Sequence, residues 1–180
     1  DGSVLGTMQV VDNHLVVADL VDTWSRLRVF DAQGRLKGEI PLPGRGTLGT
    51  GNMVYPGAID MVWKGGGSSV LFHFSAPTQS PGLYRADIHT MKVETLVEPA
   101  VKVEAGMQSH AARAVDGVRV PYQVIARPGT DLTTPRPTVI FGYGGFGASV
   151  VPGWCGNWVA AWVKAGGVLV MAHLRGGAVG

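Results

Sequence analysis

The stretch that most constrains the fold runs from Pro135 to Gly147 and reads PRPTVIFGYGGFG. A short apolar segment, Thr138–Phe141, leads directly into a loop that is dense in glycine. In α/β proteins, an apolar strand followed by a glycine-rich loop and a helix presents backbone amides and a few side chains at the carboxyl edge of a sheet. We therefore expect any chemistry of this chain to lie at this loop.

The residues after the loop complete a β-loop-α-β unit. Apolar residues at i, i+3, i+4 and i+7 predict a helix over Trp154–Ala165. Two glycines then stop the helix, and Val168–Ala172 predicts a second strand. Both Thr138–Phe141 and Val168–Ala172 are nearly all apolar, as expected of strands that are covered on both faces. The helical positions concerned are Trp158, Ala161, Trp162 and Ala165.

A hairpin precedes this unit. Gln108–Ala114 and Val118–Ala126 are separated by a segment that contains Asp116-Gly117, a strong hairpin signal. Pro121 predicts that the second of these strands lies at the edge of its sheet, because proline cannot donate to a ladder. An antiparallel hairpin joined to a β-loop-α-β unit gives a mixed sheet, which is typical of the α/β-hydrolase fold.

Residues 1–98 show a different pattern, with short strands and turns at close intervals. The first strand is expected over residues 8–11, before the turn Asp12-Asn13. A later strand is expected over residues 58–63, before a glycine turn at 65–67, and a loop over residues 75–81. The expected strands form two groups of about four, which indicates blades of a β-propeller or part of an all-β sandwich; the similar order of the groups favours the propeller. Glu98–Met107 has no clear period and is interpreted as a linker. We therefore predict one domain over residues 1–98 and another over 99–180. Arg26, Arg28 and Arg35 are expected on outward faces, where they serve solubility.

Composition and charge narrow the classes of function. The chain has 180 residues, 46% of them hydrophobic and 16% charged, so we expect a folded protein. Its net charge of +2 and the absence of a basic run argue against a nucleic-acid surface, and no apolar run is long enough to cross a bilayer. Cys155 is the only cysteine, and the five histidines lack metal-ligand spacing. We expect no metal, no cofactor and, without a signal peptide, a cytoplasmic location.

Two motifs of the second half resemble those of a known family. Gly142-Tyr143-Gly144-Gly145-Phe146 resembles the Tyr-Gly-Gly-Phe loop of the prolyl oligopeptidase family of serine peptidases. Leu174-Arg175-Gly176-Gly177 resembles that family's Arg-Gly-Gly turn. The resemblance implies the last blades of a propeller that filters short peptides, then the N-terminal part of an α/β-hydrolase domain. It also implies short proline-containing peptides as substrates, cleaved after proline.

The resemblance gives roles to the residues of the glycine loop. In the family, the matching tyrosine donates its phenol hydroxyl to the oxyanion hole, so that role falls on Tyr143, while Phe146, Gly144 and Gly145 bind the substrate. Acyl transfer builds negative charge on the carbonyl oxygen, and a donor aimed at that oxygen lowers the barrier. Arg175 either orients the loops near this site or is a solvated charge. Without the resemblance, Tyr143 is a packing residue above a tight turn.

The catalytic Ser, Asp and His of such a peptidase are not present in this chain. No G-x-S-x-G motif occurs, and in the family the serine follows well beyond the Arg-Gly-Gly turn, whereas this sequence stops at Gly180. We therefore interpret the chain as an internal fragment of a longer protein. We expect the fragment to be inactive by itself.

Two other functions fit the same residues. Gly142, Gly144 and Gly147 match the dinucleotide fingerprint G-x-G-x-x-G, which predicts NADP binding if a helix starts inside the glycines and Arg175 meets the 2′-phosphate. Pro152 and Gly153 would break such a helix. The other alternative is a non-catalytic, β-rich binding module with a degenerate hydrolase half.

Overall fold

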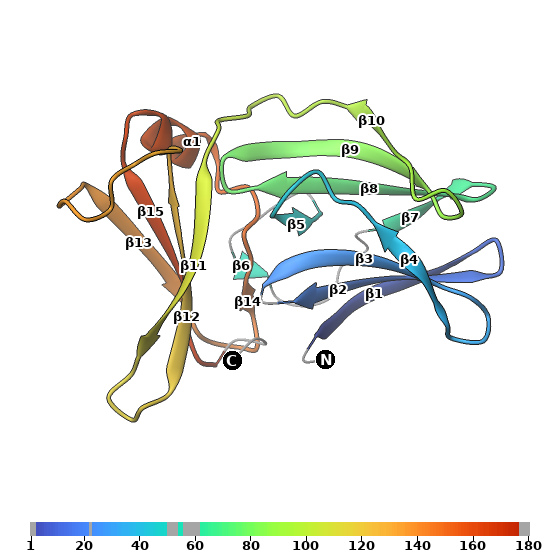
Figure 1. Cartoon of the computed structure of the whole chain (residues 1–180), viewed down its shortest axis with the longest axis horizontal. Coiled ribbons are helices and arrows are strands. Elements are labelled where there is room, and N and C mark those ends of the chain that lie inside the picture. Colours follow the sequence, from blue (N-terminus) through green and yellow to red (C-terminus); the bar gives the residue numbers. More distant parts are fainter. Residues whose placement is uncertain (1–2, 22, 50–53, 56–61, 177–180) are drawn as a thin grey trace.

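The computed structural model describes residues 3–21, 23–49, 54–55 and 62–176. Three sheets and one helix make up most of this part of the chain (Figure 1). Two antiparallel sheets from the first half lie together, and the third sheet stands beside them with the helix at one end (Figure 1). Of the described residues, none belongs to a helix long and apolar enough to cross a bilayer.

The first sheet contains four antiparallel strands in chain order. The turn between the first two is Asp12-Asn13, whose φ values of 44° and 57° fall in the left-handed region that these residue types tolerate. The four strands expected from the alternating pattern are confirmed, although the first begins earlier than expected. They are β1 (Val4–Val11), β2 (His14–Val21), β3 (Trp24–Phe30) and β4 (Leu36–Ile40).

The second sheet has the order β10-β9-β8-β5, with β7 also paired to β8. The prediction of a loop over residues 75–81 is wrong. Ala76 pairs with Gln79, so the turn between β8 and β9 consists of Pro77-Thr78 alone. The strand expected over residues 58–63 lies largely outside the described residues. The observed strand β7 ends at Gly66, so it includes two of the glycines that were expected to form a turn. The strands are β5 (Thr47–Leu48), β7 (Val62–Gly66), β8 (Ser69–Ala76), β9 (Gln79–Asp87) and β10 (Val93–Val97).

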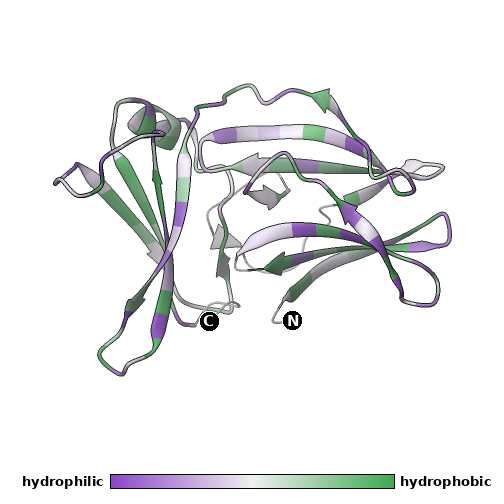
Figure 2. Cartoon of the chain, in the orientation of Figure 1, coloured by the Kyte–Doolittle hydropathy of each residue, from purple (hydrophilic) through white to green (hydrophobic). Residues whose placement is uncertain are grey.

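These two sheets share one hydrophobic core, and apolar residues alternate with polar ones along their strands (Figure 2). Phe72 and Tyr84 stack in this core with ring centroids 5.6 Å apart. Burying such side chains is the main stabilising contribution, at about 25 cal/mol per Å² of apolar surface. The fully buried members with the largest side chains are Phe72, Phe74, Leu27, Ile40, Leu48 and Ile88.

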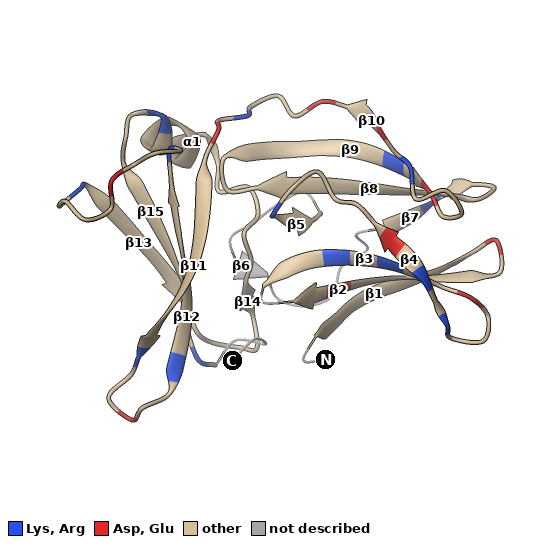
Figure 3. Cartoon of the chain, in the orientation of Figure 1, with Lys and Arg blue, Asp and Glu red and all other residues tan. Residues whose placement is uncertain are grey.

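The expectation that Arg26 and Arg28 of β3 serve only solubility is wrong, because both bind a buried aspartate. Asp19 is only 3% exposed, and Arg26 binds it through two hydrogen bonds of 3.0 and 2.7 Å, while Arg28 also pairs with it. Blue segments along β3 mark its Lys and Arg residues (Figure 3). Burial alone would raise the pKa of Asp19, but the hydrogen bond and charges of the two arginines lower it overall. Arg35 is exposed and pairs with Asp31.

The third sheet is mixed, as expected, with the order β11-β12-β15-β13. The predicted hairpin is confirmed, and β13 runs parallel to β15. The edge position expected for Pro121 is wrong, because β12 is paired on both sides; the ladder to β15 starts only at Tyr122, so Pro121 lies outside it. The strands are β11 (Gly106–Arg113), β12 (Arg119–Ala126), β13 (Thr138–Tyr143) and β15 (Val168–His173).

The helix α1 (Asn157–Lys164) covers one face of this sheet and is shorter than expected. Its buried residues are Val159, Ala160 and Val163, so the face expected from the tryptophan spacing is wrong. Two β-branched residues at i and i+4 fit against Leu169 and Met171, while the larger indoles remain at the margin. The helix ends as predicted: Gly166 has φ 97°, a conformation that favours glycine.

The two parallel strands of the third sheet differ in how well they are covered. Exposure alternates along β13, and Ile140 is 73% exposed, so the expected cover on both faces is absent for β13 among the described residues. Every residue of β15 is buried or half-buried, as expected for that strand. The inward residues of β13 join a second core with α1.

The two halves of the chain are joined by backbone pairing at two places and also by hydrogen bonds that involve side chains, from Gln123 to Thr23 and from the Trp154 amide to Ser75. Beyond β10, the backbone of residues 101–103 hydrogen-bonds to the β8–β9 turn at Thr78 and Ser80. The short strands β6 (Val54–Tyr55) and β14 (Ser149–Val150) pair across the halves. The two hydrophobic cores draw on residues from different halves. The propeller and hydrolase domains, with their boundary at residue 98, stay a prediction.

Candidate functional site

Tyr143 is the last residue of β13, and the parallel ladder places it beside His173, the last residue of β15. Its half-buried side chain packs against the second core. An ideal Cβ at Gly145 would lie 3.7 Å from the Tyr143 hydroxyl oxygen, so the phenol reaches over the glycine loop. Among the described residues, none hydrogen-bonds to this hydroxyl. The hydroxyl is thus a donor at the carboxyl end of a parallel strand pair, and no described residue accepts from it.

The loop that follows packs backbone against backbone on the turn after β15. The Gly147 amide donates to the Gly176 carbonyl at 3.0 Å, and the Ala148 amide closes a turn onto the Gly145 carbonyl at 3.0 Å. A Cβ at Gly144 would lie 2.3 Å from the carbonyl oxygen of Arg175. The two motifs singled out in the sequence are therefore in direct contact, with no room for a side chain at Gly144.

Phe146 is 98% exposed, with φ at 55°. The described residues thus build no wall around this ring, and its expected part in a substrate pocket stays a prediction. A ring held out at the tip of a tight turn is available for contact with a ligand or with another segment.

The dinucleotide interpretation of the same glycines lacks its structural basis. It requires a helix that begins inside the glycines, so that the helix amides meet a pyrophosphate. Here the loop leads into β14, and α1 begins only at Asn157. The glycines serve the close approach of two turns instead.

Arg175 is paired rather than free. Its Nη1 lies 2.5 Å from Oδ2 of Asp116, which belongs to the β11–β12 turn. The hydrogen bond from Arg175 holds the pKa of Asp116 below its ordinary value. Both side chains are about half exposed, so the pair contributes little to overall stability. Its geometric effect is to connect the hairpin tip to the turn that supports Gly144.

His173 is a buried residue of this site that the sequence analysis did not single out. Its Nδ1 lies 3.0 Å from the carbonyl oxygen of Val150, and its side chain is only 4% exposed. A carbonyl oxygen can only accept, so the proton is on Nδ1 and the ring holds β14 in place beyond the glycine loop. The sequence feature that could have identified His173 is its position directly after the predicted buried strand Val168–Ala172.

Replacing His173 is expected to remove a dependence of stability on pH. Burial lowers the pKa of His173, so below about pH 6.5 the unfolded chain takes up a proton that the folded chain does not. The free energy of unfolding should therefore fall as the pH drops below about 6.5, by at most about 1.4 kcal/mol per pH unit. Urea unfolding at about pH 7.5 and about pH 5.5 measures the loss.

The matched variant is His173→Asn, whose amide can still donate to Val150 but does not titrate. Its loss of stability between the two pH values should be smaller than that of the parent chain. The aspartates with lowered pKa values contribute only at more acidic pH, because their stabilising effect is lost as the pH falls through those values. Equal losses in both proteins would contradict the assignment to His173.

The arrangement can supply a hydrogen-bond donor to an oxyanion, but the chain carries no nucleophile in a G-x-S-x-G motif. Among the described residues there is no group of three or more His, Cys, Asp or Glu side chains that could hold a metal ion. Cys155 is buried, and burial raises the pKa of its thiol to about 12. It therefore stays protonated and is a poor nucleophile at neutral pH.

No family model matches the chain, but individual proteins do. The uncharacterized peptidase y4nA of Sinorhizobium fredii is 31% identical over 181 residues, which covers 97% of this chain and 23% of the relative. The prolyl endopeptidase of Elizabethkingia miricola is 26% identical over 164 residues, 87% of this chain and 21% of the relative. A solved prolyl endopeptidase structure superposes with a TM-score of 0.79 over 98% of this chain and 25% of that chain, at 24% identity. The chain belongs to the prolyl oligopeptidase family.

Family membership explains the architecture at a coarse level. The β-rich structure with several antiparallel sheets matches the fold of the prolyl oligopeptidases. The chain spans about a quarter of the length of the curated relatives it matches. The similarity extends over nearly the whole chain, including the first half.

Proposed function

We propose that this chain is part of a serine-type peptidase that cleaves short peptides after proline. The relatives named above are peptidases, and two of them are prolyl endopeptidases. The observation that carries the proposal is the Tyr143 hydroxyl, at the carboxyl end of β13 and without an acceptor among the described residues. In the proposed reaction, a serine outside this chain attacks the peptide carbonyl, a histidine acts as base, and Tyr143 donates to the oxyanion.

The proposal includes a division of labour between the halves. Residues 1–98 are blades of a β-propeller, and residues 99–180 begin an α/β-hydrolase domain. The two separate hydrophobic cores support this division. Phe146, Gly144 and Gly145 face the substrate, and Phe146 lies against the proline side of the scissile bond; the exposed position of Phe146 leaves its ring free for this contact.

Hydrolysis of a chromogenic Gly-Pro peptide tests the proposal. The intact protein should release the chromophore, and a serine-directed phosphonate should abolish the release, whereas the 180-residue chain should show no turnover. Turnover by the chain itself, sensitive to the phosphonate, would contradict the expected inactivity of the fragment. An intact protein without hydrolytic activity would favour the alternative, a β-rich binding module with a degenerate hydrolase half.

A further inference from the structure

The hairpin of β11 and β12 extends past the carboxyl end of the parallel strands (Figure 1). The ladder between β12 and β15 pairs Tyr122 with Ala172, and β12 continues beyond this pair to Arg119, so the hairpin turn lies past the end of β15. Strands β13 and β15 end at the same level, where Tyr143 is opposite His173. The turn between β11 and β12 is therefore at the same edge of the sheet as the Tyr143 hydroxyl.

Three hydrogen bonds within this turn fix the orientation of the Asp116 carboxylate. The Ala114 amide donates to the Val118 carbonyl and the Gly117 amide donates to the Ala114 carbonyl, both at 2.9 Å. The third bond involves Asp116 itself, whose Oδ1 accepts from the Val118 amide at 3.2 Å. Because Oδ1 is engaged within the turn, Oδ2 is left to accept from Nη1 of Arg175 at 2.5 Å.

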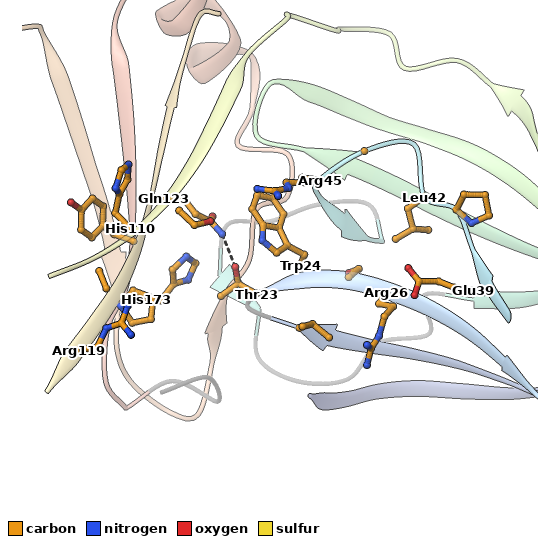
Figure 4. A pocket seen from close by; sticks show the side chains of 18 residues that line it. Thr23, Trp24, Arg26, Glu39, Leu42, Arg45, His110, Arg119, Gln123 and His173 are labelled. Carbon is orange, nitrogen blue, oxygen red and sulfur yellow. Dashed lines mark hydrogen bonds between the residues drawn. The ribbon is translucent and has the colours of Figure 1, made fainter. Parts of the chain in front are cut away.

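Arg175 is the partner of Asp116 although two arginines of the hairpin are closer in the sequence. Nη1 of Arg113 donates to the Gly117 carbonyl at 3.2 Å. Arg119 lines the pocket between the first and third sheets (Figure 4). The Asp116 carboxylate therefore joins the hairpin to the turn after β15. The hydrogen bond from Arg175 lowers the pKa of Asp116, so the carboxylate is ionised at neutral pH.

The main chain of Arg175 lies against the glycine loop. A Cβ at Gly144 would lie 2.3 Å from the Arg175 carbonyl oxygen, and a Cβ at Gly176 would lie 2.8 Å from the Gly144 carbonyl oxygen. The Gly147 amide donates to the Gly176 carbonyl at 3.0 Å. Arg175 thus makes two kinds of contact: its side chain binds the hairpin turn, and its backbone supports the residue that follows Tyr143.

We propose that Asp116 is a positioning residue for the Tyr143 hydroxyl. By binding Arg175, it holds the turn after β15 against Gly144, and it thereby fixes the end of β13 that carries the phenol. The inference rests on the proposed peptidase function, because it concerns the geometry of the oxyanion donor. Asp116 touches neither the substrate nor the reacting atoms, and it acts only through Tyr143.

The expected effect on catalysis is modest but specific. An exposed ion pair can bias the position of the turn by no more than its own interaction free energy, which corresponds to a factor of about five. Asp116→Asn keeps an oxygen that can accept from Val118 and removes the charge that binds Arg175. In the intact protein, this variant should lower kcat for a Gly-Pro peptide about fivefold and leave KM unchanged, since the oxyanion forms only after the substrate has bound.

Two comparisons separate positioning from a general structural effect. Asp131→Asn removes the charge of another exposed aspartate, whose carboxylate bonds to Thr133 within the β12–β13 loop, and its kcat should equal the parental value. In a Tyr143→Phe background, Asp116→Asn should cause no further loss, because the hydroxyl that it positions is gone. A parental kcat in Asp116→Asn, a loss confined to KM, or a fivefold loss that persists in the Tyr143→Phe background would overturn the proposal.

Hydrogen exchange of the Gly147 amide tests the same contact without hydrolysis. This amide is bonded to the Gly176 carbonyl, so its exchange rate reports how often the turn and the loop separate. Mass spectrometry of peptides that span the loop should show about fivefold faster exchange in intact Asp116→Asn and no change in Asp131→Asn. Unchanged exchange in a protein with phosphonate-sensitive hydrolysis refutes the role of Asp116 alone. Faster exchange in a protein without hydrolysis supports the contact of Asp116 with the loop and refutes the peptidase function.

Discussion

Tyr143→Phe in the intact protein is expected to lower kcat by about 10²–10³ and to leave KM nearly unchanged. The phenol hydroxyl lies at the end of β13 and makes no hydrogen bond to the described residues. A donor that meets charge only as the tetrahedral intermediate forms stabilises the transition state and not the bound substrate. Removing one oxygen atom keeps the ring in its place on the second core. Steady-state kinetics on a Gly-Pro peptide measure both constants.

A control for this prediction is Tyr84→Phe, which removes a phenol hydroxyl from the first core. Both variants lose the same atom, but the Tyr84 ring packs against Phe72 and Phe74 in the first core. Its kcat should equal that of the parent protein, even if its unfolding midpoint falls slightly. If Tyr143→Phe keeps the parental kcat, or if the loss appears only in KM, the oxyanion role is refuted.

Much of the strand pattern follows from local sequence. Alternating apolar residues and turn residues such as Asp12-Asn13 and Asp116-Gly117 specify hairpins, and both hairpins have the expected turns. Such signals act over a few residues, where the backbone alone selects the conformation. They do not decide which strand lies beside a hairpin, so Pro121 was expected at an edge although β15 pairs beyond it.

Contacts between segments that are distant in the sequence cannot be predicted from such local signals. β6 and β14 are two residues each, and their pairing joins residues 54–55 to residues 149–150. The apolar residues of α1 could form either of two buried helical faces. In the structure, the face with Val159 and Val163 packs into the second core. Arg28 resembled a solvated charge because its partner, Asp19, lies on the neighbouring strand.

The candidate site could be predicted only in part, because local sequence signals place some of its residues and not others. Tyr143 follows a short apolar strand, and strand ends of parallel pairs meet at one edge, so its position at that edge follows from the pattern. The contact of Gln123 with Thr23 joins residues that are 100 positions apart. No local pattern specifies such a contact, which emerges only from the folded arrangement.

Gly144→Ala is expected to be the most damaging small substitution in the loop. An ideal Cβ at this position would lie 2.3 Å from the Arg175 carbonyl oxygen and 2.8 Å from Cβ of Leu174. Neither atom can rotate away, because one is backbone and the other is fixed to it. The loop or the turn must move, at a cost of about 1–3 kcal/mol in the free energy of unfolding. A displacement of about 1 Å at Tyr143 is enough to lower kcat/KM about 10²-fold in the intact protein.

Gly145→Ala provides the matched comparison for stability, since the two glycines are adjacent. Its Cβ would meet only the Tyr143 ring and hydroxyl, at 3.7 Å or more, which is ordinary contact. The free energy of unfolding should change by about 0.5 kcal/mol or less, measured by urea denaturation under the same conditions. Equal destabilisation by both substitutions would mean that general stiffening of the loop, and not the contact between Gly144 and the Arg175 carbonyl, causes the loss. A neutral Gly144→Ala would show that the two turns separate readily, and the fixed position of Tyr143 would then lack its structural support.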